Sequence, residues 1–101
     1  MPYSIAGSSE EVFSTSKEEE QIDKTNVTDA ETEVEFSEEV KAWLIFNDGP
    51  NAVHYTLVTG VDTDNHKIPS GVAWGEDVPT KKIFMICASG DNADVYIVGL
   101  R

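Results

Sequence analysis

The chain has 101 residues, of which 40% are hydrophobic and 26% charged, which is the composition of one soluble globular domain. Its formal net charge of −12 repels nucleic acids and anionic membranes, and no apolar run approaches the roughly 20 residues needed to span a bilayer. The single cysteine, Cys87, excludes an internal disulfide framework, and the first residues lack the basic start and apolar centre of a signal peptide. We therefore expect a protein made in a cytoplasm, with no cofactor, no metal, no nucleic-acid partner and no membrane.

The negative charge is concentrated at the N-terminal side of the chain. Residues 1–40 hold twelve acids and two lysines, a net charge of 2 − 12 = −10, whereas residues 41–101 hold seven acids and five bases, a net charge of 5 − 7 = −2. Residues 8–33 contain only isolated apolar side chains, too few to offset the entropy lost on folding. We therefore predict an acidic N-terminal arm over residues 1–33 and a folded domain over residues 34–101.

The arm has two interpretations. Its composition is that of a solvated, disordered tail, with a capping-box pattern that predicts a marginal helix over residues 17–24. Alternatively, a neighbouring chain orders the arm through apolar anchors and through acids that meet basic groups. The anchors for this second case are Tyr3, Ile5, Val12 and Phe13. The acids are Glu18, Glu19 and Glu20.

Beyond the arm, apolar and polar residues alternate with the period of β-strands. Six or seven strands are predicted, over residues 33–37, 40–47, 52–58, 80–88 and 93–100, with short edge strands within residues 67–79. Residues 42–46 are apolar almost throughout, as in a strand covered on both faces. Because no segment predicts a helix long enough to cover a sheet, we expect an all-β fold, a β-sandwich of immunoglobulin-like or jelly-roll-like type.

The stretch "NDGPN" (residues 47–51) separates two of these strands. Gly49 tolerates a positive φ, and Pro50 is expected to end the strand before it. The two flanking runs and this short loop predict a β-hairpin, with Val53, Tyr55 and Leu57 on one face of its second strand.

Few side chains suit catalysis. His54, His66 and Cys87 are the residues able to act as base or nucleophile near neutral pH, and Cys87 lies in an apolar strand that predicts a core position. The loop "DTDNH" (residues 62–66) lacks the later Gly and Glu of a calcium loop, so a polar turn is favoured over a metal site. No carboxylate pair, phosphate loop or nucleophile elbow is present, and we expect no enzymatic activity.

The two tryptophans differ in setting. Trp43 lies in the most apolar strand and is expected in the core, whereas Trp74 lies beside Gly75 in a broken segment and is expected near the surface. A surface tryptophan is a frequent anchor of protein interfaces and also a sugar-stacking platform. We favour the interface, and the sugar hypothesis pairs Trp74 with Tyr55.

Three stretches also suggest a family: a strand ending in "NDGPN", the segment "IPSGVAWGED", and the closing "TKKIFMICASGDNADVYIVGL". Residues 40–100 thereby resemble a loose group of small virion proteins of tailed bacteriophages. The resemblance implies a β-sandwich with an N-terminal arm, placed on capsids, necks or tail-fibre bases. From it we expect a head decoration (cement) protein at the capsid surface, whose partners are the major capsid protein and copies of itself. A neck or tail connector component and a carbohydrate-binding virion module are the alternatives.

Overall fold

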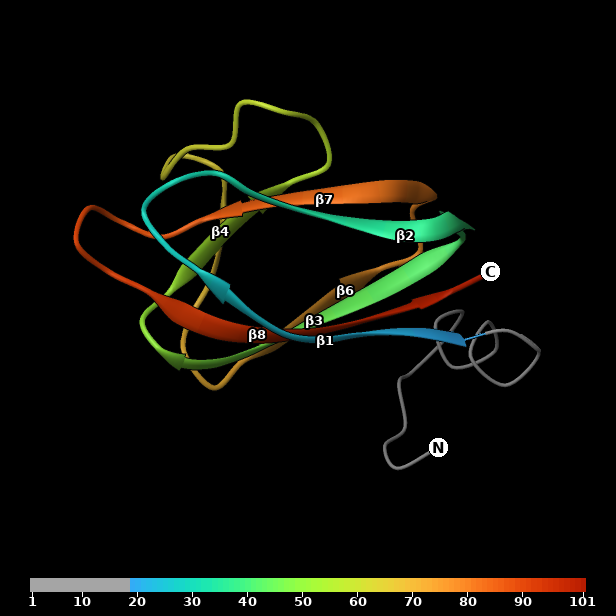
Figure 1. Cartoon of the computed structure of the whole chain (residues 1–101), viewed down its shortest axis with the longest axis horizontal. Helices are drawn as coiled ribbons and strands as arrows, with labels where there is room; N and C mark the ends of the chain where they lie inside the picture. Colours follow the sequence, from blue (N-terminus) through green and yellow to red (C-terminus); the bar gives the residue numbers. More distant parts are fainter. Residues whose placement is uncertain (1–18) are drawn as a thin grey trace.

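The computed structural model describes residues 19–101 as eight strands in two antiparallel four-stranded sheets (Figure 1). Sheet A has the order β1 (Glu19–Val27), β8 (Ala93–Leu100), β3 (Ala42–Pro50) and β6 (Ala73–Glu76). Sheet B has the order β2 (Thr32–Val40), β7 (Thr80–Ile86), β4 (Val53–Thr56) and β5 (His66–Ile68). No helix that could span a membrane occurs among residues 19–101. The predicted all-β sandwich is confirmed.

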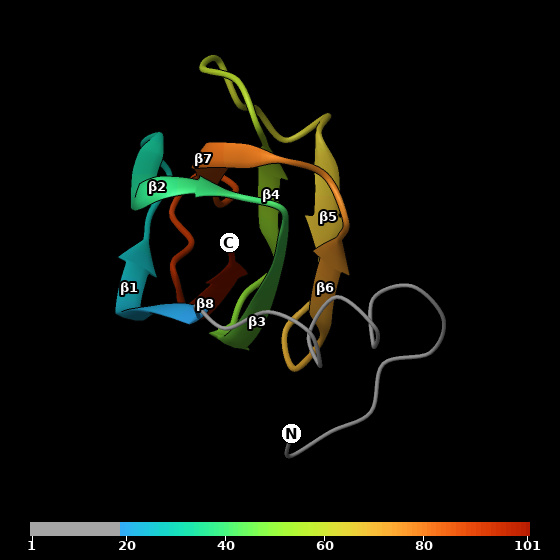
Figure 2. The ribbon, with the colours of Figure 1, turned by 90° about the vertical axis from the view of Figure 1, so that its right-hand side faces the viewer.

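The chain moves from one sheet to the other at nearly every turn. Only β4 and β5 are successive strands of the same sheet, so six of the seven connections between the described strands cross the sandwich. Viewed from the end, the edge strands β1 and β2 lie at one side and the edge strands β5 and β6 at the other (Figure 2). The two short strands predicted within residues 67–79 are thus both edge strands.

The predicted hairpin at "NDGPN" is wrong, because β3 belongs to sheet A and β4 to sheet B. Gly49 does have the expected positive φ, of +91°. Pro50, however, does not stop β3. It is the last residue of that strand and lies opposite Ala93, after a bulge between Asn47 and Gly49 that shifts the register. A proline is tolerated beside a bulge, where a ladder hydrogen bond is already missing.

Asn47 fixes the direction of this corner. Its side chain is fully buried, its amide nitrogen donates to the carbonyls of Asn51 and Ile68, and its oxygen accepts from the Gly49 N–H. All three contacts satisfy polar groups that burial would otherwise leave unpaired. The bonds therefore hold the chain as it leaves sheet A and enters sheet B.

Part of the predicted arm belongs to the sandwich. From Glu19 on, the chain forms strand β1, which pairs with β8 over its length, so the helix predicted for residues 17–24 is wrong for the described residues 19–24. Ile22 packs against the core and Val27 is fully buried. Tertiary pairing overrides a weak local helix preference here. The folded domain accordingly begins at least as early as Glu19, not at Val34.

The core lies between the two sheets and follows the predicted alternation. Val53 and Tyr55 of β4 point inward. The same is true of Ile83 and Met85 of β7 and of Val95 and Ile97 of β8. Trp43 and Cys87 are each about 1% exposed, which confirms both as core residues. Gly99 faces inward where Phe36 and Val40 approach so closely that no Cβ would fit.

Candidate interaction surface

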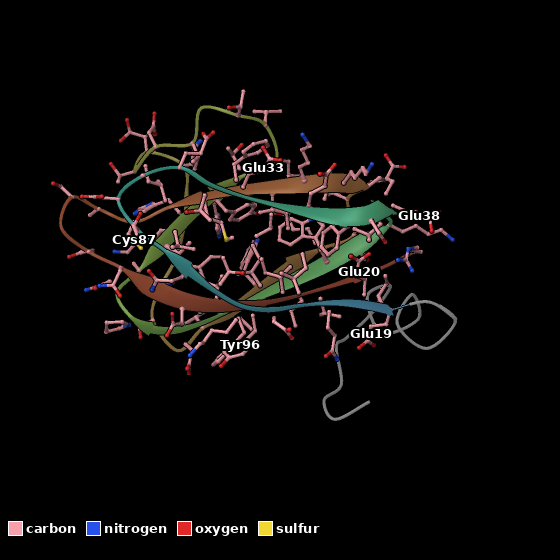
Figure 3. All side chains as sticks on the ribbon, in the orientation of Figure 1. Glu19, Glu20, Glu33, Glu38, Cys87 and Tyr96 are labelled. Carbon is pink, nitrogen blue, oxygen red and sulfur yellow. The ribbon has the colours of Figure 1, made fainter. Side chains whose placement is uncertain are left out.

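The outer face of sheet A carries exposed apolar side chains from its two central strands. Phe46 of β3 lies opposite Tyr96 of β8 in the strand register, with ring centroids 6.5 Å apart. The two residues are 36% and 43% exposed, so both rings present apolar surface to solvent. Figure 3 shows Tyr96 on the side of sheet A that faces away from sheet B. We call this surface the sheet A face.

A groove of about 280 Å³ crosses the sheet A face over β1, β8 and β3. Its lining includes Gln21, Asp23, Leu44, Phe46, Tyr96 and Val98. Leu44 lies opposite Val98 and Phe46 opposite Tyr96, so two neighbouring rows of the sheet supply its apolar surface. An exposed apolar patch with a polar edge is typical of an interaction site.

The outer face of sheet B has a different character. Glu33 and Glu35 of β2 form ion pairs with Lys82 and Lys81 of β7, at 3.4 and 3.6 Å. Exposed pairs of this kind contribute little to stability and leave the surface charged and hydrated. The two outer faces therefore differ: the sheet A face is apolar with a groove, and the outer face of sheet B is charged.

Trp74 belongs to a compact cluster at the β5–β6 side of the sandwich. Its ring lies over His66, with centroids 4.3 Å apart, and its Nε1 donates to the Tyr55 hydroxyl at 3.0 Å and to Glu76 at 3.1 Å. The Tyr55 hydroxyl in turn donates to the same Glu76 carboxylate. The ring of Tyr55 also meets Trp43 edge-on at 5.1 Å, so the cluster continues into the core.

The electrostatics of the cluster follow from these bonds. The hydrogen bond from Tyr55, and then that from Trp74, lower the pKa of Glu76, while burial and the Glu76 carboxylate raise the pKa of Tyr55. Trp74 is 39% exposed, in agreement with its predicted surface position, but its N–H is already used inside the chain. Tyr55 is only 6% exposed, so the hypothesis that it is a sugar-stacking platform is wrong.

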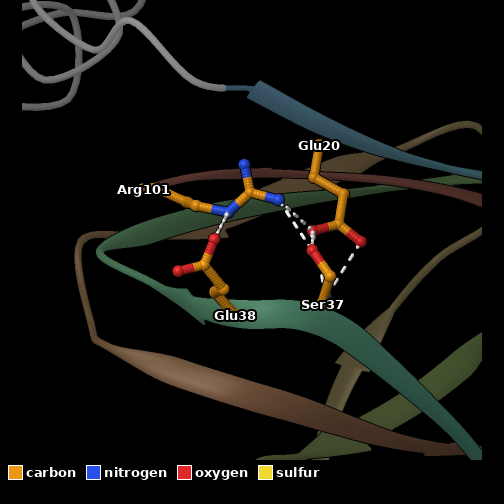
Figure 4. A network of polar contacts seen from close by, with 4 residues as sticks. All are labelled: Glu20, Ser37, Glu38 and Arg101. Carbon is orange, nitrogen blue, oxygen red and sulfur yellow. Dashed lines mark hydrogen bonds and ion pairs between the residues drawn. The ribbon is translucent and has the colours of Figure 1, made fainter.

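The acid run at the start of β1 divides between two environments. Glu19 is exposed and accepts a hydrogen bond from the Gln21 side chain. Glu20 faces the other way and accepts bonds from the Ser37 backbone and hydroxyl and from Arg101 (Figure 4). The Ser37 hydroxyl bond is the largest cause of a lowered pKa at Glu20. Glu38 pairs with Arg101 at 3.5 Å, so the network joins β1, β2 and the end of β8.

The remaining residues considered from the sequence are the interface candidates before Glu19 and the polar loop at residues 62–66. Five interface candidates fall outside the described residues 19–101: Tyr3, Ile5, Val12, Phe13 and Glu18. In the "DTDNH" loop, Asp62 accepts from the Asp64 N–H and Asn65 accepts from the Asp62 N–H, which is a polar turn held by its own side chains. The described residues contain no group of three or more potential metal ligands.

Cys87, His54 and His66, the three candidate bases or nucleophiles, each contact different groups. Its thiol donates to the Val27 carbonyl at 3.4 Å, and burial raises its pKa, which opposes the thiolate needed for nucleophilic chemistry. His54 contacts the Asn65 carbonyl and His66 stacks with Trp74. None of these contacts joins Cys87 to a histidine.

Sequence reasoning missed the sheet A face, although a signal was present. The continuous apolar run over residues 42–46 predicted a strand covered on both faces. The inner face of that strand is covered, whereas on its other face Leu44 and Phe46 line the groove and only Ala42 is fully buried.

Comparison with protein-family models, with curated proteins and with solved structures found no match for this chain.

Proposed function

We propose that this chain is a non-catalytic decoration (cement) protein of a bacteriophage head, which docks on the major capsid protein through the sheet A face. The observation that supports docking is the contrast between the two outer faces. One has an apolar groove with the exposed Phe46–Tyr96 pair, and the other is charged and ion-paired. The phage setting comes from the resemblance of residues 40–100 to small virion proteins.

Such a protein stabilises a lattice by burying apolar surface against it. Completing the burial of Phe46 and Tyr96 is worth about 2 kcal/mol for each ring, from roughly 25 cal/mol per Å² of apolar area. That alone does not hold a small domain against the entropy of association. Contacts to several capsid subunits and to neighbouring copies of the chain multiply weak binding into firm retention. The segment 1–18, with its four apolar anchors, supplies a second such contact in this proposal.

A neck or tail component is the second candidate, because the same face suits docking in a ring. The number and placement of bound copies distinguish the two. The carbohydrate-binding alternative is weaker, since Tyr55 is buried and the Trp74 N–H is bonded within the chain.

The test is binding to phage heads that lack decoration, followed by heating of the heads. Four proteins are compared: the full chain, a chain starting at Glu19, a Phe46→Ser/Tyr96→Ser variant, and a Glu33→Ser/Glu35→Ser variant on the outer face of sheet B. A chain starting at Val34 is unsuitable, because it lacks strand β1. Circular dichroism confirms that each protein is folded before binding is compared.

We expect the full chain and the sheet B variant to coat the head and raise its resistance to heat. The Phe46→Ser/Tyr96→Ser variant should fail, and the shortened chain should bind more weakly. Attachment as a single ring at one vertex would favour the neck candidate. No attachment of the full chain, or undiminished attachment of the Phe46→Ser/Tyr96→Ser variant, would refute docking on heads through this face.

A further inference from the structure

The groove on the sheet A face has an apolar floor and an acidic edge. Asp23 belongs to its lining beside Tyr96. Asp94 alternates with Tyr96 along β8 on the same face, and Asp48 is exposed at the bulge that follows Phe46. Each of the three strands β1, β8 and β3 thus carries an acid on or next to this face. Asp23 lines the groove itself, whereas Asp94, which accepts a hydrogen bond from the Asn26 side chain, and Asp48 lie beyond its lining.

Basic residues are scarce around this groove. Strands β3, β6 and β8 contain no lysine or arginine, and β1 contains only Lys24. On β1, Glu19 is a further exposed acid, which accepts a hydrogen bond from the Gln21 side chain. The whole chain, at −12, adds a long-range negative potential to this local charge.

From this charge pattern we propose that the groove receives a protein segment in which an apolar or aromatic side chain is flanked by lysines or arginines. This inference rests on the proposed function, because it specifies the chemistry of the capsid segment that the sheet A face contacts. The apolar side chain lies against Phe46 and Tyr96, and the flanking cations lie near Asp23, Asp48 and Asp94. Opposite charges at the edge of an interface steer association and select among partners.

The same charges argue against two other occupants. A second copy docking face to face brings Asp23, Asp48 and Asp94 toward their own counterparts, which is unfavourable. The chain's own residues 1–18 contain three glutamates and one lysine, a net charge of 1 − 3 = −2. Neither surface complements an acidic edge, whereas a basic segment does.

The experiment uses the full chain and two short peptides that share a Leu-Phe-Leu centre, one flanked by lysines and the other by glutamates. Fluorescence anisotropy gives the affinities, and shifts of backbone amide signals in NMR spectra locate the binding. We expect the lysine-flanked peptide to bind roughly tenfold more tightly and to shift signals of β1, β3 and β8. Raising salt from about 50 to about 500 mM should reduce the difference.

A pair of charge variants serves as the control. Asp23→Asn/Asp48→Asn should remove most of the preference for the lysine-flanked peptide, while Glu33→Gln/Glu35→Gln, on the outer face of sheet B, should preserve it. Equal binding of both peptides, or shifts confined to other strands, would overturn the inference. Dimers seen by sedimentation would overturn it in favour of a second copy of the chain. If the peptides do not bind but deletion of residues 1–18 shifts the signals of β1, β3 and β8, residues 1–18 are the occupant and the inference is overturned. Peptide binding is measured without heads, so its failure and the failure of head decoration are separate results.

Discussion

The Tyr55 hydroxyl donates a hydrogen bond to the Glu76 carboxylate and thereby joins sheet B to sheet A. Tyr55 belongs to β4, and Glu76 to β6, the edge strand of the opposite sheet. Trp74 donates to both groups, so the carboxylate links side chains of the two sheets at the β5–β6 side of the sandwich.

Tyr55→Phe should therefore destabilise the protein by about 1–2 kcal/mol, since the Glu76 carboxylate loses a donor while the aromatic ring is retained. Urea unfolding followed by tryptophan fluorescence measures the change. His66→Ala, which removes a stacking partner but no bond to Glu76, is the comparison variant. An unchanged unfolding midpoint for Tyr55→Phe would mean that the link between the sheets contributes nothing to stability.

The same bond predicts how the tyrosines ionise. Burial and the neighbouring carboxylate raise the pKa of Tyr55, so this hydroxyl should stay protonated in the folded chain as alkali is added. In a spectrophotometric titration of tyrosinate, the absorbance of one of the three tyrosines should appear only with unfolding. In Tyr55→Phe that late step should be absent.

The lowered pKa of Glu20 predicts that the folded protein loses stability in acid. Its pKa is lowered in the folded state by the Ser37 hydroxyl, so its contribution is fully present above its ordinary value, near 4.3, and is lost as the pH falls through the folded-state pKa. Glu20→Gln should lower the unfolding midpoint at pH 7 and flatten its fall as the pH drops below the ordinary glutamate pKa of about 4.3. Glu19→Gln changes the same charge one residue away, without contact to Ser37 or Arg101. If both variants show the same pH profile, the network in Figure 4 does not act through Glu20.

Glu31 holds the long loop between β4 and β5. Its carboxylate accepts hydrogen bonds from the Gly60 and Val61 N–H groups and from the Thr59 hydroxyl, and the Gly60 bond is the largest cause of its lowered pKa. Glu31→Ala should increase hydrogen exchange at the amides of residues 60 and 61 and leave the amide of Met85 protected. Thr59→Ala, which removes one of the three bonds, should have a smaller effect. Unchanged exchange at both amides would show that the loop is held by other contacts.

Gly99 lies at a close approach between the two sheets. A Cβ there would lie 2.7 Å from side-chain atoms of both Phe36 and Val40, closer than packed atoms allow. Gly99→Ala should cost about 1–3 kcal/mol of unfolding free energy. Val40→Ala frees part of that space, so the double variant should be more stable than the sum of the two single effects predicts. Strict additivity would mean that the clash is relieved elsewhere.

Residue alternation was sufficient to predict the strands after β1 and their inward faces, because a strand between a core and solvent must alternate. Val53 and Tyr55 of β4, and Trp43 of β3, were placed correctly on that basis. Pairing was not predictable, because the pattern of β3 and β4 is the same whether they pair or pack across the core. β1 was missed because most of its side chains are charged or polar, and its strand form depends on β8.

The interaction surface was predictable only in part. Trp74 was correctly expected near the surface, but nothing local shows that Glu76 and Tyr55 occupy its N–H. Phe46 and Tyr96 are 50 residues apart in sequence and meet only because β3 and β8 are neighbours. A surface assembled from distant strands has no sequence motif.

The position of β8 in the middle of sheet A affects how the chain can fold during its synthesis. β1 and β3 are both synthesised well before β8, yet each pairs with β8 and not with the other. Sheet A therefore lacks its central strand until residues 93–100 have left the ribosome. Until then β1 has no pairing partner and β3 has only β6, whereas all four strands of sheet B have already been synthesised. Folding of this domain therefore depends on contacts distant in sequence, which is the class of topology that folds slowly.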